Sequence, residues 1–151
     1  MTSANSKKST AIIKTEQDLI NYGENLAKTL APGATVELLG DVGAGKTTLT
    51  KGIAKGLKIP EEITSPSFVI SKRYQYRTNN KDQALVHYDF YRLSDPGIMA
   101  DDLAENLADK NTITVIEWAN TVANLLPENR TKITITLNDD NTRTVERSLA
   151  K

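Results

Sequence analysis

The stretch from Gly40 to Thr47 has the residue types and the spacing that bind a phosphate chain. It reads GDVGAGKT and matches the pattern G-x-x-x-x-G-K-[ST]. Its glycines let successive backbone N–H groups point at phosphate oxygens, and a helix beginning near Lys46 adds the positive end of its dipole. In such a loop the lysine lies between the β- and γ-phosphates and the Thr47 hydroxyl ligates Mg²⁺. The motif therefore predicts a nucleotide site, in preference to a glycine-rich turn that only opens a helix.

Two acidic residues stand at the ends of predicted strands, where a site of this kind needs them. Asp89 ends the run LVHYD, and Glu117 ends the run TITVIE. Carboxylates there would lie at the carboxyl edge of the sheet, where α/β proteins place their ligands. Asp89 is expected in the metal shell, directly or through water; the alternative is an aspartate that caps the following turn. Glu117 is expected to polarise the attacking water or orient the metal; the alternative is a strand-end acid in an ion pair.

Two further features close to these acids have simpler explanations. The segment TSPSF at 64–68 could reach the γ-phosphate as a switch, but hydroxyls beside proline are also ordinary turn chemistry. His87 is the only histidine, and on a regular strand it shares a face with Asp89. A single histidine in a strand more often packs and makes a hydrogen bond than takes part in catalysis. That structural role is the expectation for His87.

The elements that must position these residues follow from the hydrophobic pattern. Helical spacing predicts a helix from Thr15 to Leu30, with Thr15 and Asp18 as a capping box. Two more helices are predicted, at 46–57 and 94–107, the second with Asp95 as cap and Pro96 in its first position. Runs of apolar and β-branched residues predict strands at 35–39, 67–76, 83–89, 112–117, 131–137 and 142–149.

This order of elements predicts an α/β fold with a mixed β-sheet flanked by helices, resembling a P-loop NTPase. Two β-hairpins belong to it, one around TNNKD and one around NDDN. Residues 1–14 are small, polar and basic at their start, so they are predicted to form a flexible tail before a single domain at 15–151.

The composition excludes several function classes. Nineteen basic residues balance nineteen acidic ones, so no net field attracts a polyanion. Cysteine is absent, which rules out disulfides, thiolate zinc sites and cysteine nucleophiles and fits a reducing compartment. No apolar stretch approaches the ~18 residues of a membrane span, and residues 1–14 lack the apolar core of a signal peptide. The expectation is a cytoplasmic protein that does not enter a membrane.

The segments GDVGAGKTT, SPSF, HYDFYRL and VIEW, in this order and at these separations, resemble the TsaE family (older name YjeE). These are small bacterial ATPases needed to form threonylcarbamoyladenosine in tRNA, and the resemblance runs from about Thr15 to the final hairpin. It implies ATP and Mg²⁺ as cofactors. The nucleotide-binding residues that it implies are Asp41, Val42, Gly43, Ala44, Gly45, Lys46, Thr47, Thr48, Ser67 and Trp118.

The resemblance also implies roles and partners. Lys46, Asp89 and Glu117 would be the catalytic residues, and the implied metal-binding residues are Thr47, Asp89 and Glu117. The SPSF segment would be a switch that senses the γ-phosphate, with Ser67 in place of the family's usual threonine. The family docks with ATP bound on a complex of TsaB and TsaD, which modifies the adenosine beside the anticodon, and hydrolysis supports repeated rounds. Contact with tRNA would be weak or indirect, and a monomer is favoured.

Three other functions are alternatives to this one. A GTPase needs an N/T-K-x-D segment, and in the nearest string, NNKDQ, Asp82 follows Lys81 directly. A small-metabolite kinase of this size is the serious alternative, although no helical lid pattern carries its arginines. A module that holds nucleotide only as a structural ligand would not need both Asp89 and Glu117. No arginine stands beside the glycine loop in the sequence, which predicts slow hydrolysis by the chain alone.

Overall fold

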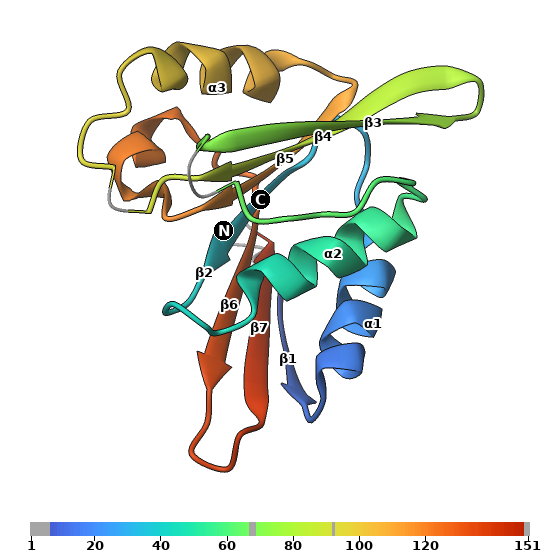
Figure 1. Ribbon diagram of the computed structural model, residues 1–151, viewed down its shortest axis with the longest axis vertical. Coiled ribbons are helices and arrows are strands. Elements are labelled where there is room, and N and C mark those ends of the chain that lie inside the picture. Colours follow the sequence, from blue (N-terminus) through green and yellow to red (C-terminus); the bar gives the residue numbers. More distant parts are fainter. Residues whose placement is uncertain (1–6, 67–68, 92, 150–151) are drawn as a thin grey trace, which may run out of the picture.

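A seven-stranded mixed sheet forms the centre of the computed structural model, which describes residues 7–66, 69–91 and 93–149 (Figure 1). Its strands are β1 (Lys7–Ile13), β2 (Thr35–Leu39), β3 (Ser71–Thr78), β4 (Lys81–Asp89), β5 (Thr112–Glu117), β6 (Thr131–Leu137) and β7 (Arg143–Leu149). They lie in the order β1-β7-β6-β2-β5-β4-β3. The central strands β6, β2, β5 and β4 are parallel, whereas β3 and β7 run antiparallel to their neighbours. The predicted mixed α/β sheet with two hairpins is confirmed.

Four helical segments cover this sheet, namely α1 (Glu16–Ala27), α2 (Lys46–Gly56), α3 (Ile98–Ala108) and the 3-10 helix η1 (Ala119–Leu125). The Thr15 hydroxyl accepts a hydrogen bond from the Asp18 N–H at 3.0 Å, so Thr15 caps α1 as predicted. Figure 1 shows α1 and α2 side by side and α3 away from them. None of the described helices is long and apolar enough to cross a bilayer.

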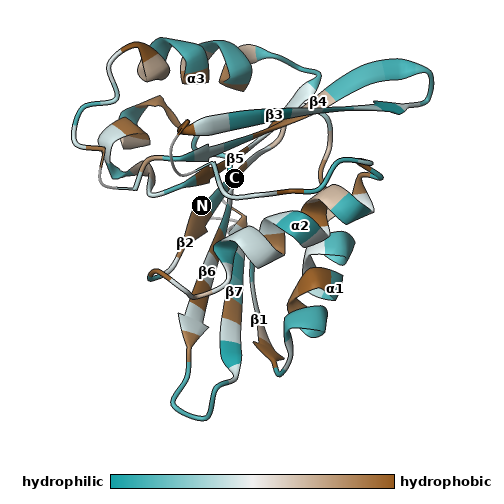
Figure 2. Cartoon of the chain, in the orientation of Figure 1, coloured by the Kyte–Doolittle hydropathy of each residue, from teal (hydrophilic) through white to brown (hydrophobic). Residues whose placement is uncertain are grey.

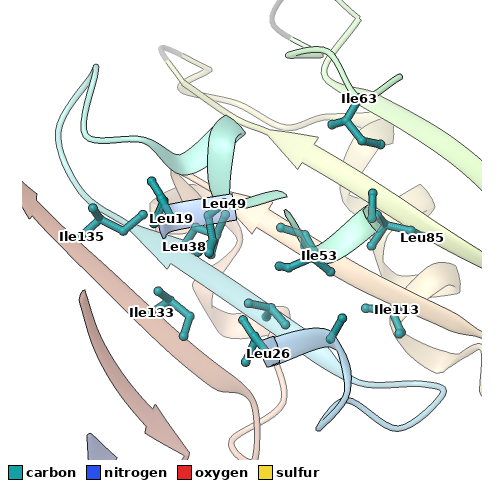
Figure 3. Packing of buried hydrophobic residues seen from close by; sticks show 14 of the residues in the cluster. Leu19, Leu26, Leu38, Leu49, Ile53, Ile63, Leu85, Ile113, Ile133 and Ile135 are labelled. Atoms are coloured by element: carbon teal, nitrogen blue, oxygen red, sulfur yellow. The ribbon is translucent and has the colours of Figure 1, made fainter. Parts of the chain in front are cut away.

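The core divides into two clusters because alternate residues of the central strands face opposite sides of the sheet. One cluster joins α1 and α2 to the sheet, through Leu19, Leu49 and Ile53 among others (Figure 3). The second cluster joins α3 and η1 to the other face, with Leu103 and Val122 against Tyr88. In Figure 2 the tips of both hairpins are hydrophilic, so the buried contacts lie along the middle of the sheet.

The predicted N-terminal tail is corrected in part. Residues 7–13 form strand β1, which pairs antiparallel with β7 along its whole length. Ile13 is buried in the larger core cluster, whereas Ile12 is exposed. Ala11, on the same face as Ile13, packs against that cluster as well, so only the end of an otherwise polar strand faces inward, which is a weak sequence signal.

Several predicted boundaries also shift. The strand predicted from residue 67 begins at Ser71, because Val69 and Ile70 turn back to the Pro66 carbonyl and Ile70 has a left-handed φ of 70°. The helix predicted from residue 94 begins at Ile98, since Asp95 instead caps a turn by accepting from the Gly97 N–H. The η1 helix was not predicted. Asn79 and Asn80 alone close the first hairpin, with φ of 51° and 63° as in a type I′ turn.

Candidate functional site

The glycine loop joins the end of β2 to the start of α2, as its motif requires. Gly40, Gly43 and Gly45 adopt φ of 150°, 84° and 118°, which residues with a side chain rarely adopt. A Cβ on Gly45 would lie 2.6 Å from the Leu19 side chain, so that position also has no room. The loop closes through a 3.0 Å hydrogen bond from the Ala44 N–H to the Asp41 carbonyl, and α2 begins at Lys46. This backbone has the form of a phosphate-binding loop at a helix N-terminus.

A cavity of about 460 Å³ lies over the loop. It brings residues from five separate segments together, in the size range of a small-molecule site. Its lining residues are Val42, Gly43, Gly45, Lys46, Thr47, Thr48, Ser65, Asp89, Tyr91, Glu117, Trp118 and Arg143. Most of the residues expected from the sequence therefore share one cavity.

Two of the expected nucleotide-binding residues, Asp41 and Ala44, do not line this cavity. Asp41 and Ala44 line a separate hollow of about 480 Å³ on the side of the loop toward β6. They can still serve the loop through their backbone. The Asp41 carbonyl accepts from the Ala44 N–H and from Lys46 Nζ, and the Ala44 carbonyl accepts from Arg143 Nε. Ser67 lies outside the described residues, although Ser65 of the same segment lines the cavity.

Lys46 is held inside the loop. Its side chain is 6% exposed, and Nζ donates to the carbonyls of Gly40 at 2.5 Å and Asp41 at 3.1 Å. The same nitrogen lies 4.4 Å from the centre of the Trp118 ring, a cation–π contact. Burial lowers the pKa of Lys46, and the carboxylates of Glu117 and Asp89 oppose that change. A bound phosphate could replace the two carbonyls as the hydrogen-bond partner of Nζ. Its negative charge would stabilise the charged form of Lys46, which burial disfavours.

Asp89 and Glu117 are neighbours on adjacent parallel strands. They form a register pair at the carboxyl ends of β4 and β5. Asp89 Oδ1 accepts a 2.9 Å hydrogen bond from the Tyr91 N–H, so the capping alternative describes part of what this side chain does. Burial raises the pKa of Asp89, the Tyr91 N–H bond lowers it, and the Glu117 carboxylate raises it further. Two close carboxylates suit a site that binds a cation.

Glu117 lies where both of the roles expected for it would place it. It lines the cavity, yet it is only 4% exposed and its Oε2 lies 2.5 Å from His87 Nε2. His87 is fully buried and does not line the cavity. The expectation that His87 packs and makes a hydrogen bond is confirmed, but its partner could not be read from the spacing.

Trp118 has a strained backbone conformation, and its ring lies between Tyr91 and Lys46 in the site. Its φ of 57° and ψ of 52° are left-handed, which is uncommon for a bulky residue. Its ring lies 4.8 Å from the Tyr91 ring and below the Lys46 ammonium. Strain of this kind persists where the surroundings fix it and is concentrated at functional sites.

Arg143 is a cavity residue that the sequence analysis missed. It opens β7, and its Nε donates to the Ala44 carbonyl of the glycine loop at 2.6 Å. No arginine is near the loop in the sequence, but the fold places Arg143 beside it. The two residues are 99 positions apart, and only the pairing of β7 beside β6 brings them together, so no local signal could have found the contact.

The oxygen donors of the cavity fit Mg²⁺. No cluster of three His, Cys, Asp or Glu side chains able to hold a metal occurs in the part of the chain that the structure describes. Mg²⁺ seldom needs such a cluster, because it is commonly held by one or two carboxylates together with substrate phosphates and water. The Thr47 hydroxyl and the carboxylates of Asp89 and Glu117 supply hard oxygens of that kind along the cavity wall.

Comparisons with known proteins converge on one family. The family model described as Threonylcarbamoyl adenosine biosynthesis protein TsaE matches residues 13–146. A tRNA threonylcarbamoyladenosine biosynthesis protein TsaE from Treponema pallidum is 35% identical over 134 residues, 89% of this chain and 96% of the relative. The protein of the same name from Streptomyces coelicolor is 38% identical over 113 residues, 75% of each chain. The solved structure of Bacillus subtilis YdiB superimposes with a TM-score of 0.75 at 28% identity, over 99% of this chain and 90% of that one.

Proposed function

Because the chain belongs to the TsaE family, which acts in the biosynthesis of threonylcarbamoyladenosine in tRNA, we propose that it serves there as a Mg²⁺-dependent ATPase. The observation that carries this proposal is the meeting of Lys46, Asp89 and Glu117 in one cavity over the glycine loop. A site that only stored nucleotide would need the loop, but it would not need two carboxylates beside the terminal phosphate.

The chain's own groups divide the work of hydrolysis. The loop amides and Lys46 bind the phosphate chain and absorb the charge that develops as the terminal phosphoryl group leaves. Thr47, Asp89 and Glu117 would hold Mg²⁺, which when bound neutralises charge on the β- and γ-phosphates. Glu117 is the group proposed to orient the attacking water, with the 64–68 segment as the alternative. Ser67 belongs to that segment as the proposed sensor of the γ-phosphate.

The remaining proposed nucleotide contacts follow the cavity wall. Val42, Gly43, Gly45 and Thr48 line the cavity and would lie along the phosphate chain, and Trp118 would pack beside it. Asp41 and Ala44 contribute through the backbone that shapes the loop.

Hydrolysis by the chain alone is expected to be slow and to quicken on docking to a TsaB–TsaD-type complex. Arg143 is the one arginine among the described residues that lines the cavity, and the bond from its Nε to the Ala44 carbonyl ties it to the loop backbone. Val42 and Tyr91 line the cavity and are also exposed, so a partner could cover them and exclude water from the phosphates. The balanced net charge supports docking on a protein partner, with tRNA contacted weakly or indirectly. The cytoplasm is the proposed location.

The test measures ATP binding and turnover by the pure protein, with and without the TsaB–TsaD complex and tRNA. Wild type should bind ATP and be stimulated by the complex, and Glu117→Ala should lose the stimulated turnover. Lys46→Ala should lose tight ATP binding. The control is Lys51→Ala, an exposed lysine on the same helix. Undiminished ATP affinity in Lys46→Ala would contradict the proposed mechanism, and phosphate transfer to a metabolite without stimulation would favour a kinase.

A further inference from the structure

The buried ring of His87 makes its contact from behind the cavity wall. It is 0% exposed, and its Nε2 lies 2.5 Å from Glu117 Oε2. A carboxylate can only accept a hydrogen bond, so Nε2 carries the proton and donates it. Nδ1 has no hydrogen-bond partner among the described residues, so the bond to Glu117 is the hydrogen bond that the ring makes there.

This bond limits what Glu117 can do. Because Oε2 already accepts from His87, Oε1 is the oxygen that keeps its full capacity to accept hydrogen bonds. The backbone of Glu117 is fixed as well, because its carbonyl accepts a 3.1 Å hydrogen bond from the Phe90 N–H. These two contacts restrict the orientation of the Glu117 carboxylate, which is the condition for orienting a water molecule.

The bond also keeps Glu117 away from the nearby lysine. Lys46 is close enough for the Glu117 charge to affect its pKa, yet the two make no ion pair among the described residues. Two opposite charges in a partly buried site attract strongly, and direct pairing would withdraw both from a substrate. The His87 bond opposes direct pairing of Glu117 with Lys46, so that Lys46 stays hydrogen-bonded to the loop carbonyls.

We propose that His87 is a positioning residue that holds the Glu117 carboxylate in place for ATP hydrolysis, so that Glu117 serves the reaction through Oε1. This inference rests on the proposed ATPase function. His87 touches neither the nucleotide nor the reacting water, and it acts only through Glu117.

Two substitutions separate positioning from packing. His87→Gln keeps an N–H donor near the place of Nε2, whereas His87→Leu fills the space without a donor. Val86→Ala is the matched control, because Val86 is a buried neighbour on the same strand that packs in the core cluster on the opposite face. Each variant is compared by its ATP dissociation constant, its single-turnover hydrolysis rate and its melting temperature.

The hydrolysis rate and the ATP affinity should respond differently to loss of the His87 donor. His87→Leu is expected to slow hydrolysis roughly 10–100-fold, the usual effect of losing an outer-shell partner, with ATP affinity changed less than about threefold. His87→Gln should recover much of the lost rate. In a Glu117→Ala background His87→Leu should have no further effect on the rate. A His87→Leu rate equal to that of Val86→Ala, or an equal loss in the Glu117→Ala background, would overturn the proposal.

The contact has a readout that does not depend on ATP. His87 is the only histidine, so ¹⁵N spectra of the imidazole contain one pair of ring signals. They should report the Nε2–H tautomer in wild type and shift in Glu117→Ala. Signals unchanged by Glu117→Ala would overturn the contact itself. Wild-type protein that neither binds nor hydrolyses ATP, with the signals behaving as expected, would refute the ATPase function and the catalytic part of the proposal while the contact stood.

Discussion

At the scale of single residues, the cavity is built from charges that the folded chain holds at a cost. Burial lowers the pKa of Lys46 and raises that of Asp89, so both charged forms are disfavoured in the absence of a ligand. A phosphate beside Lys46 and a cation beside Asp89 would each relieve that cost. Ligand binding and folding stability are therefore linked at this site.

Asp89→Asn should consequently stabilise the ligand-free protein while it weakens the site. The amide removes the cost of a half-buried carboxylate, and its oxygen can still accept from the Tyr91 N–H. The melting temperature should rise by a few degrees at most, because solvent screens the partly exposed charge. Affinity for Mg²⁺–ATP should fall roughly 10–100-fold.

Calorimetry with and without Mg²⁺–ATP measures both effects. Asp82→Asn is the control, since Asp82 pairs with Arg77 at an exposed hairpin tip. A lower melting temperature together with unchanged Mg²⁺–ATP affinity in Asp89→Asn would show that Asp89 has only the turn-capping role.

At the scale of elements, the glycine loop depends on how closely α2 packs on α1. A Cβ on Gly52 would lie 2.2 Å from the Ile20 carbonyl oxygen, and one on Gly23 would lie 2.5 Å from the Leu49 carbonyl oxygen. The two helices are thus in contact through their backbones. Since α2 begins at Lys46, its position along α1 also sets the position of the phosphate loop.

Gly52→Ala should therefore destabilise the protein, against the usual preference of helices for alanine. The added methyl group forces the helices apart, and overpacking of this kind costs about 1–3 kcal/mol. Urea unfolding of Gly52→Ala beside Lys51→Ala, an exposed change on the same helix, isolates the packing effect. A Gly52→Ala protein at least as stable as wild type would mean that the helices separate freely.

The turn that leads from α3 into β5 depends on a carboxylate. Asp109 accepts hydrogen bonds from the Asn111 N–H and the Thr112 hydroxyl, both at 2.9 Å, and these bonds lower the pKa of Asp109. A pKa lower in the folded than in the unfolded chain means that the stabilisation is present at neutral pH. It is lost as the pH falls through the folded value.

Asp109→Ala should therefore unfold at lower urea concentration than wild type at pH 7, and the difference should shrink toward pH 3. Glu105→Ala, which removes an exposed carboxylate from α3, should show no comparable narrowing. A difference between Asp109→Ala and wild type that stays constant with pH would show that the loss is one of packing and not of charge.

The sequence predicted what depends on local pattern and missed what depends on strand order. The loop before α2 and the strand-end acids Asp89 and Glu117 were predicted, because motif spacing and the carboxyl-edge rule are local signals. The His87–Glu117 bond needs β4 beside β5, and the Arg143–Ala44 bond needs β7 beside β6. Neither pairing can be read from one segment alone.

At the scale of the whole molecule, the edge of the sheet is connected to the phosphate loop. Ile13 of β1 is the register partner of Arg143 in β7, and Arg143 in turn holds the Ala44 carbonyl. The first strand therefore supports the segment that fixes the loop, although it lies at the far edge of the sheet from Asp89. A strand with this position should unfold together with the rest of the domain.

Two adjacent isoleucines test whether β1 belongs to that cooperative unit. Ile13 is 6% exposed and packs in the larger core cluster, whereas Ile12 is 58% exposed on the opposite side of the strand. Ile13→Ala should cost about 2–4 kcal/mol through lost burial and a residual cavity, and Ile12→Ala less than about 0.5 kcal/mol. Urea unfolding followed by far-ultraviolet circular dichroism and by Trp118 fluorescence measures both. The two probes should give coincident transitions that move together in Ile13→Ala, because Trp118 lies beside the phosphate loop and the strand does not. Equal stability of the two variants would instead mean that β1 adds nothing to the domain and that the loop is held without it.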